Sequence, residues 1–161
     1  LNVDFSNHTL SIGKENAVLN QFSEPQFEIF HDDAMLVLRQ FSGLGMRGKA
    51  KRRQFTKRTA RLFDIVVLDP PRRAKSPFGT VDTVNDYQSI FKPALLCTKP
   101  GGKMLVTNNV ASVDLDAWVE SLKRCAMKIE RSIQSVEVLT PDEDFPSVDG
   151  LHPLKMAWLS V

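Results

Sequence analysis

The sequence predicts an α/β fold with a doubly wound, mostly parallel sheet, helices on both faces and an antiparallel strand at the carboxyl end. Two patterns support this prediction. Apolar, β-branched runs alternate with amphipathic helical segments, and two such runs follow one another without a helix near the end. With 161 residues, of which 42% are hydrophobic, the chain is expected to form one packed soluble domain, residues 1–161. This arrangement is Rossmann-like.

Two strand–helix units are expected in the first half of the chain. The first strand ends on Asp4, and Ser6 or Asn7 can cap the helix that follows. The second helix begins at Asp32 and Asp33, because acids are stabilised at the positive end of a helix. The third strand, Phe-Asp-Ile-Val-Val-Leu, is typical of a buried parallel strand. These expected elements are strands at residues 1–4, 27–30 and 63–68 and helices ending at residues 19 and 41.

The second half starts with a long polar connection at residues 72–83, where no helix or strand is expected. A helix containing Pro93 follows, and Pro100-Gly101-Gly102 then turns the chain. A loop rich in Pro and Asp at residues 141–153 precedes the last strand. The expected elements are helices at residues 86–98 and 115–127 and strands at residues 103–107, 133–139 and 154–161.

The positive charge of the chain is concentrated in a basic loop, residues 42–61. Between Arg47 and Arg61 it contains eight cations and no acid. Such a segment attracts phosphate and indicates a nucleic-acid contact, although a solvated loop without a partner explains it equally well. The cations are Arg47, Lys49, Lys51, Arg52, Arg53, Lys57, Arg58 and Arg61.

The two cysteines, Cys97 and Cys125, lie in apolar helical contexts without the spacing of metal ligands. We therefore expect two reduced packing residues, with no disulfide framework and no metal site. No apolar stretch is long enough to span a membrane, and no signal peptide is visible. The expected location is the cytosol or an organelle interior, a plastid included.

An acid follows each of the first three expected strands, at Asp4, Asp33 and Asp69. Ligands of doubly wound sheets bind at the carboxyl ends of the strands. There a carboxylate can accept hydrogen bonds from ribose hydroxyls or from the amine of adenine. Asp4 and Asp33 can equally serve only as helix caps. Asp69 is followed by two prolines, which stiffen the turn and favour a shaped site.

Several motifs along the chain together resemble the class I S-adenosylmethionine-dependent methyltransferases that act on large-subunit ribosomal RNA, with their plant and cyanobacterial relatives. The motifs are Asn2-Val3-Asp4-Phe5-Ser6, Glu15 to Asn20, Asp32-Asp33-Ala34, Val67-Leu68-Asp69-Pro70-Pro71, Ala74-Lys75-Ser76, Asp86-Tyr87, Pro100-Gly101-Gly102, Thr107-Asn108-Asn109 and Asp144-Phe145-Pro146. The resemblance implies S-adenosylmethionine as cofactor and ribosomal RNA as partner, without a membrane partner.

The resemblance also implies roles for individual residues. Asp4, with Phe5, would hold the ribose of the methyl donor. Asp33 and Ala34 would meet its adenine. Asp69 with Pro70 would line the methyl-transfer site and contact the cofactor.

The chain departs from this family in three ways, of which the first two concern the cofactor and the target atom. The family's first strand and its Gly-rich loop, which holds the methionine part of the cofactor, are not seen before Leu1. The chain is therefore expected to be an N-terminally truncated catalytic domain. Alone, it is expected to bind the cofactor weakly or not at all and to be inactive. Relatives that methylate carbon 5 of cytosine place a cysteine where this chain has Asn108 and Asn109. An Asn pair resembles relatives that methylate a guanine ring nitrogen, so nitrogen is favoured over carbon 5. The pair can alternatively cap the strand.

Relatives usually carry an aromatic residue where this chain has Arg73. An Arg plane can stack on a base, and Phe78 lies close enough along the chain to substitute for the missing ring. Arg72, Arg73 and Lys75 are candidate phosphate contacts, and they can equally be solvated charges without a partner. Two other functions stay open: a non-catalytic RNA-binding module on the same fold, and a methyltransferase for a small molecule or a protein.

Overall fold

The computed structural model describes residues 1–23, 26–46, 48–52, 54–76, 78–142, 144–145, 147 and 152–161. Arg47 and Arg53 of the basic loop and Pro146 of the last motif lie outside these residues. Among the described residues, no helix is long and apolar enough to cross a membrane. The elements are β1 (Asn2–Asp4), α1 (Asn7–Leu19), β2 (Ile29–His31), α2 (Ala34–Phe41), the short 3₁₀ helix η1 (Gly48–Arg52), β3 (Phe63–Leu68), β4 (Arg73–Ser76), β5 (Gly79–Asp82), α3 (Gln88–Cys97), β6 (Thr98–Asn109), α4 (Leu115–Met127), β7 (Ser135–Leu139) and β8 (Leu154–Ser160).

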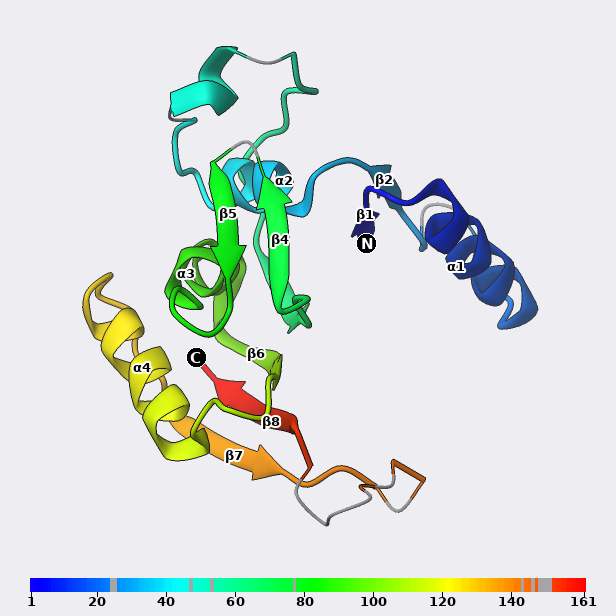
Figure 1. Ribbon diagram of the computed structural model, residues 1–161. Coiled ribbons are helices and arrows are strands. Elements are labelled where there is room, and N and C mark those ends of the chain that lie inside the picture. Colours follow the sequence, from blue (N-terminus) through cyan, green and yellow to red (C-terminus); the bar gives the residue numbers. More distant parts are fainter. Residues whose placement is uncertain are drawn as a thin grey trace.

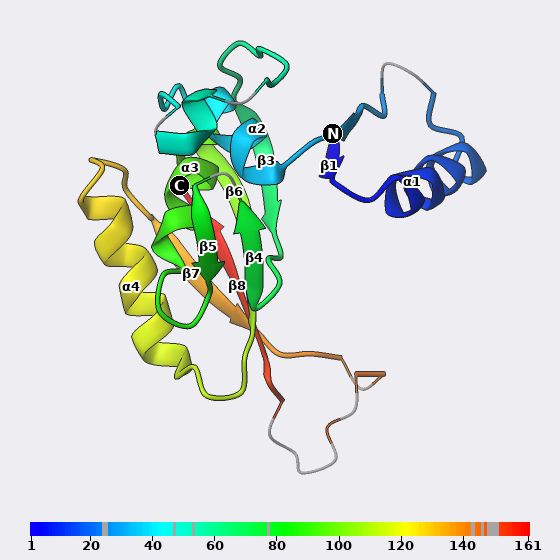
Figure 2. The same ribbon diagram turned by 45° about the horizontal axis from the view of Figure 1, so that its top comes forward.

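The strands form three separate sheets. β1 and β2 make a parallel pair, β4 and β5 make an antiparallel hairpin, and the other four strands form a sheet of order β3-β6-β8-β7. In this larger sheet β3 and β6 are parallel, whereas β8 runs antiparallel to both of its neighbours. Figures 1 and 2 both show α1, β1 and β2 standing apart from the four-stranded sheet.

One face of the four-stranded sheet is covered by α3 and α4. Alternate residues of the central strands β6 and β8 point to this face and are fully buried, among them Met104, Val106, Ala157 and Leu159. Leu122 of α4 and Leu95 of α3 complete this main core. The alternation explains why these strands are buried on one side and partly exposed on the other.

A second, smaller core connects the β1–β2 pair to the rest of the molecule. Val37 and Phe41 of α2 pack there with Cys97, and Phe30 and Phe63 join them from β2 and β3. The Phe41 ring lies 6.2 Å from that of Phe30 and 5.5 Å from that of Phe63, measured between centroids. α2 is therefore the element that holds the two parts together.

Much of the element prediction is confirmed. Ser6 caps α1, Asp33 caps α2, and α4 has the expected bounds. The connection at residues 72–83 was expected to be irregular, and that prediction is wrong, since it contains the β4–β5 hairpin. The Pro100–Gly102 turn was expected to precede β6 and instead lies inside it, at an irregularity in the pairing with β3.

The sequence predicted one continuous sheet. This prediction is wrong in one respect, because no strand pairing joins β1 to β3 within the described residues. Each of these strands pairs on one side only. On β3 the outward side chains Ile65 and Val67 are 58% and 64% exposed, although both are apolar. The region between β1 and β3 is thus bounded by two open strand edges.

The tight packing at Gly102 gives a stability prediction. A Cβ at this position would lie 2.9 Å from the carbonyl oxygens of Asp64 and Lys99, which are backbone atoms that cannot move aside cheaply. We expect Gly102→Ala to lower the free energy of unfolding by about 1–3 kcal/mol. The melting temperature, followed by circular dichroism, should fall by about 2–4 °C per kcal/mol.

Gly45→Ala is the matched control, because a Cβ there meets no atom within 4 Å. Equal melting temperatures for the two variants would contradict the close approach of β3 to β6 at Gly102.

Candidate functional site

Asp4 and Asp33 lie side by side at the carboxyl end of the β1–β2 pair. Asp4 is opposite His31 in the parallel register, and its carbonyl oxygen accepts a hydrogen bond from the Asp32 N–H at 3.1 Å. One carboxylate oxygen of Asp4 accepts from the Ser6 N–H at 2.8 Å. One oxygen of Asp33 accepts from the N–H groups of Met35 and Leu36. Both acids therefore act as caps, and the Asp4 carboxylate uses one of its two oxygens for this.

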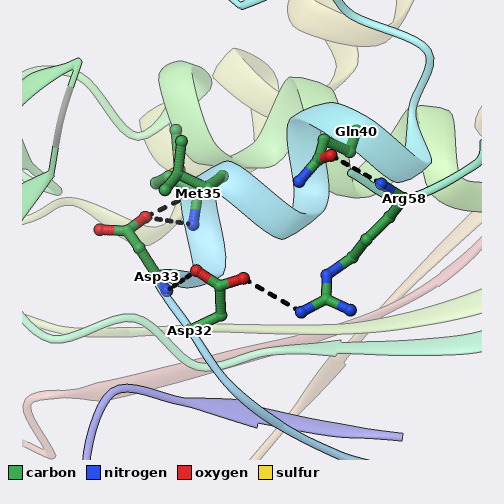
Figure 3. Close-up of polar contacts among 6 residues, drawn as sticks. Asp32, Asp33, Met35, Gln40 and Arg58 are labelled. Atoms are coloured by element: carbon green, nitrogen blue, oxygen red, sulfur yellow. Dashed lines mark hydrogen bonds and ion pairs between the residues drawn. The ribbon is translucent and has the colours of Figure 1, made fainter. Parts of the chain in front are cut away.

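Asp32, the neighbour of Asp33, is engaged by the basic loop (Figure 3). Its Oδ2 lies 3.0 Å from Nη2 of Arg58, and both side chains are mostly buried. The Arg58 guanidinium also lies 3.8 Å above the centre of the Phe30 ring, and the Arg58 N–H donates to Oε1 of Gln40 at 2.8 Å. The two consecutive acids thus differ in role. Asp32 anchors the basic loop, and Asp33 faces the turn into α2.

The third acid, Asp69, follows β3 and is tied to β6. Its carboxylate accepts a hydrogen bond from the Thr107 hydroxyl. The Thr107 carbonyl in turn accepts from the Tyr87 hydroxyl at 2.8 Å. Burial, followed by the negative charge of Asp69, raises the pKa of Tyr87 far above its usual value. Tyr87 therefore stays a neutral donor, and it links the start of α3 to the end of β6.

A second link holds the same region. The Thr83 N–H and hydroxyl both donate to the Arg72 carbonyl, at 3.0 and 3.1 Å. The side-chain amide of Asn108 donates to the Thr83 carbonyl at 3.2 Å. Asn108 is only 1% exposed, whereas Asn109 is exposed. Of the Asn pair, only Asn109 presents its side chain to solvent.

The three acids form two groups rather than one. Asp4 and Asp33 adjoin at the end of one sheet, and Asp69 lies at the end of another. Within the described residues no strand pairing connects β3, which Asp69 follows, with the β1–β2 pair. Each of the three acids follows a strand in the sequence, as expected. The region between Asp69 and the other two acids is bounded by the unpaired edges of β1 and β3.

The residues expected to contact substrate lie on or beside the β4–β5 hairpin. Arg73 is exposed and lies 3.8 Å from Asp82, and Lys75 is exposed on the same strand. Phe78 packs against the main core, and the guanidinium carbon of Arg39 lies 4.9 Å from its ring centre. This placement does not favour Phe78 as a stacking surface for a base.

The basic loop is partly neutralised within the chain. Besides Arg58, Arg61 donates two hydrogen bonds to Glu28, at 2.8 and 2.9 Å. These bonds lower the pKa of Glu28 and raise that of Arg61. Lys51, Arg52 and Lys57 are exposed and make no ion pair among the described residues. These pairings were not predicted from the sequence, which shows only a run of like charges.

Both cysteines are free and buried, as expected. Cys97 donates to the Leu38 carbonyl at 3.4 Å, and burial raises the pKa of its thiol to about 12. Burial also raises the pKa of Cys125. Because the thiolate is the nucleophilic form, neither residue is suited to attack a substrate.

Curated relatives of this chain are large-subunit ribosomal RNA methyltransferases. "Ribosomal RNA large subunit methyltransferase I" of Aliivibrio fischeri strain MJ11 is 25% identical over 153 residues, which cover 95% of this chain and 35% of that protein. The protein of the same name from Yersinia pestis bv. Antiqua, strain Antiqua, is 24% identical over 156 residues, covering 94% and 36%. The chain thus spans about a third of the length of these relatives. No protein-family model matches it.

Solved structures give the same result for the fold. SMU.776, a candidate methyltransferase solved in complex with SAH, matches 99% of this chain with a TM-score of 0.70 and 16% identity, over 38% of its own length. A SAM-dependent methyltransferase from Agrobacterium tumefaciens matches 98% with a TM-score of 0.63 and 17% identity, over 46% of its length. The Rossmann-like fold class and the resemblance to methyltransferases are confirmed.

The buried thiols predict a low chemical reactivity. At pH 8 we expect neither cysteine of the folded protein to react with an aromatic disulfide reagent, because Cys97 ionises only near its raised pKa of about 12. Both thiols should react after unfolding in guanidinium. In the unfolded protein the Cys97 thiol ionises near its ordinary pKa of 9.0, whereas in the folded protein it ionises near 12. The stability contributed by the neutral, buried thiol is therefore fully present below pH 9.0 and is lost as the pH rises towards 12.

Rapid reaction of one thiol in the folded protein would contradict the burial, and mass spectrometry of the labelled peptide would identify it.

Proposed function

We propose that the protein transfers a methyl group from S-adenosylmethionine to a base of ribosomal RNA. The observation that carries this proposal is the position of Asp4, Asp33 and Asp69, each at the carboxyl end of a parallel strand. In doubly wound folds this edge binds the ligand. The relatives named above support the substrate class, and the SAH bound to SMU.776 supports the cofactor.

The residues at the end of the β1–β2 pair fit the nucleoside part of the cofactor. The second carboxylate oxygen of Asp4 makes no hydrogen bond within the described chain, so Asp4 can accept from ribose hydroxyls. The Phe5 ring beside it is 82% exposed and can cover the sugar or the adenine. Asp33 and the exposed Ala34 would meet the adenine edge. Bound S-adenosylmethionine supplies an electrophilic methyl group.

The methionine part of the cofactor needs a further element. We propose that a parallel strand with a Gly-rich turn occupies the space between the open edges of β1 and β3. The exposure of Ile65 and Val67 supports this, because apolar side chains in a β-strand are usually covered. Such a strand would join the two sheets and bring Asp69 into one edge with Asp4 and Asp33.

Asp69 and Pro70 are proposed to line the methyl-transfer site. The hydrogen bond from Thr107 orients the Asp69 carboxylate, and the two prolines restrict the backbone after it. A held carboxylate can accept a proton or a hydrogen bond from an amino group of the target base. Catalysis would then rest mainly on positioning the base in line with the methyl group.

We further propose that the target atom is a base nitrogen rather than carbon 5 of cytosine. Addition to carbon 5 needs a thiolate, and both thiols of this chain are buried with raised pKa values. Asn109 is exposed at the end of β6 and can contact the base. Asn108 would act only by positioning the Thr83 segment.

RNA would be held by the exposed cations of the basic loop and by Arg73 and Lys75. The loop is fixed to the body of the protein by Arg58 and Arg61, so its remaining charges keep a defined position relative to Asp33. The cytosol or an organelle interior, a plastid included, stays our predicted location.

The separation of Asp69 from the other two acids supports a second candidate function, a non-catalytic RNA-binding module. Such a module would bind RNA with the same salt dependence but would transfer no methyl group. The first experiment below separates these functions.

The decisive test compares Asp69→Ala with Asp64→Ala in cells that lack the endogenous protein. Asp64 lies on β3, the strand that Asp69 follows. It is exposed, and Lys99 is its one ion-pair partner among the described residues, so its loss should leave methylation unchanged. We expect Asp69→Ala to lower the methylation rate at least about 100-fold, because the base and the methyl group lose their alignment. Mass spectrometry of ribosomal RNA from cells with each variant measures the modified nucleotide and its target atom.

No difference in RNA modification between cells with and without the protein would overturn the proposed activity and leave the binding module. A modified carbon 5 of cytosine would overturn only the nitrogen target.

The basic loop predicts a salt dependence. For Lys51→Ser/Lys57→Ser we expect the slope of log affinity against log salt to fall by about 1.4–1.8, which is two phosphate contacts at about 0.7–0.9 each. Lys14→Ser/Lys128→Ser removes two exposed cations, one from α1 and one from the end of α4, and serves as control. Filter binding of ribosomal RNA at several salt concentrations measures both slopes. Equal slopes would show that the basic loop does not contact phosphate.

A further inference from the structure

Asp32 lies between the end of β2 and the start of α2, and both of its carboxylate oxygens are engaged (Figure 3). Oδ1 accepts a hydrogen bond from the Asp33 N–H at 2.9 Å. Oδ2 accepts a hydrogen bond from Nη2 of Arg58 at 3.0 Å, across 26 positions of the chain. The Asp32 carboxylate therefore joins the basic loop to the backbone of Asp33, the residue proposed to meet the adenine.

Arg58 contacts three elements around this turn. Its guanidinium carbon lies 3.8 Å from the centre of the Phe30 ring in β2, and its backbone N–H donates to Oε1 of Gln40 in α2. Only 16% of the Arg58 side chain and 17% of the Asp32 side chain are exposed. A mostly buried ion pair is weakly screened by salt, and a carboxylate left there without its partner is costly. The ion pair is thus a fixed part of the turn.

The turn itself connects the two residues proposed to meet the adenine with the end of β1. The Asp32 N–H donates to the Asp4 carbonyl oxygen at 3.1 Å. Asp33 then caps α2 through its Oδ1, and Ala34 is exposed beside it. The position of Asp33 and Ala34 relative to Asp4 therefore depends on the Asp32 carboxylate, whose charge Arg58 compensates.

We propose that Arg58 is a positioning residue for the adenine of the methyl donor, a proposal that rests on the proposed function. Arg58 acts through Asp32, because the charge-assisted bond between them keeps the Asp32 carboxylate on the Asp33 N–H. Asp33 is then in place to meet the adenine amine, which a displaced turn would meet poorly. The basic loop thereby contributes to recognition of the cofactor as well as to the proposed contact with RNA.

Two probes that differ only at the adenine amine test this position. S-adenosylhomocysteine carries the amine, and S-inosylhomocysteine carries a carbonyl oxygen in its place. Because a carboxylate accepts from the amine and repels the carbonyl oxygen, the unaltered full-length protein should bind the adenosyl probe more tightly, as measured by isothermal titration calorimetry. For Arg58→Gln we expect the affinity for the adenosyl probe to fall about tenfold, the effect of one hydrogen bond to a charged group, and that for the inosyl probe to change less than about twofold.

A double variant tests whether Arg58 acts through Asp32. Asp32→Asn keeps an oxygen for the Asp33 N–H but removes the charge that pairs with Arg58, so it should also lower the preference for the adenosyl probe. Arg58→Gln/Asp32→Asn should weaken binding no more than the stronger single variant, because residues that act through one contact are not additive. Arg58→Lys restores the charge without the planar fork and should regain part of the preference.

Arg61→Gln is the matched control. Arg61 belongs to the same loop, pairs with Glu28, and has its guanidinium carbon 4.9 Å from the centre of the Phe63 ring. Glu28 precedes β2, at the end away from Asp33, so this variant should leave both affinities unchanged. The melting temperature shows whether each variant is folded. If Arg58→Gln does not fold, Arg58→Lys and Asp32→Asn provide the test.

An unchanged preference in the Arg58 and Asp32 variants, or equal losses for both probes, overturns the proposal. An additive loss in the double variant, or the same loss in Arg61→Gln, also overturns it. So does an unaltered protein that binds both probes equally. Methylated ribosomal RNA in cells together with any of these results would sink this proposal alone. If the unaltered full-length protein binds neither probe, the proposed function and this proposal fail together.

Discussion

The attachment of residues 69–87 to the end of β6 is the constraint on which the candidate site depends. This segment leaves a buried strand and must satisfy its polar groups before α3 begins. The Asp69 carboxylate accepts a hydrogen bond from the Thr107 hydroxyl, and the Tyr87 hydroxyl donates to the Thr107 carbonyl. The side-chain amide of Asn108 donates to the Thr83 carbonyl. Buried polar groups are costly when unpaired, so these bonds fix the turn in one arrangement. The proposed methyl-transfer site lies at these bonds, because Asp69 is one of the bonded residues.

The second constraint is the connection through α2. Its apolar face packs with rings from β2 and β3, and its N-terminus is set by Asp33. The ion pair of Arg58 with Asp32 adds the basic loop to the same unit. The residues proposed to bind the cofactor and the cations proposed to bind phosphate are therefore linked through this one short helix. A change in any of these three parts is expected to affect the position of the other two.

Most of the fold was predictable from local sequence. The caps Ser6 and Asp33 and the alternation in β6 and β8 are local signals, because helix ends and strand faces are set by residues a few positions apart. The β4–β5 hairpin was not predicted, since its strands are polar and its turn has no common two-residue signature. The lack of pairing between β1 and β3 depends on contacts far apart in the chain, and no local pattern reports it.

The same limits apply to the site. Asp4, Asp33 and Asp69 could be placed at strand ends from the sequence alone, and their roles as ligands stay predictions. The ion pairs of Arg58 and Arg61 could not be foreseen, because an ion pair requires the fold to bring residues together across 26 or 33 positions. Trp118 looked like an ordinary core residue of an amphipathic helix. Only the structure shows that its buried indole Nε1 has no hydrogen-bond partner among the described residues.

The open edge of β3 has a consequence for handling the protein. An unpaired edge strand with apolar side chains is a template for pairing with another chain, and natural proteins protect such edges with lysines, prolines or bulges. The segment from Ile65 to Val67 contains no lysine or proline, and both of these side chains are exposed. Residues 1–161 produced alone will therefore tend to aggregate through this edge, and adding a segment that covers it should restore solubility.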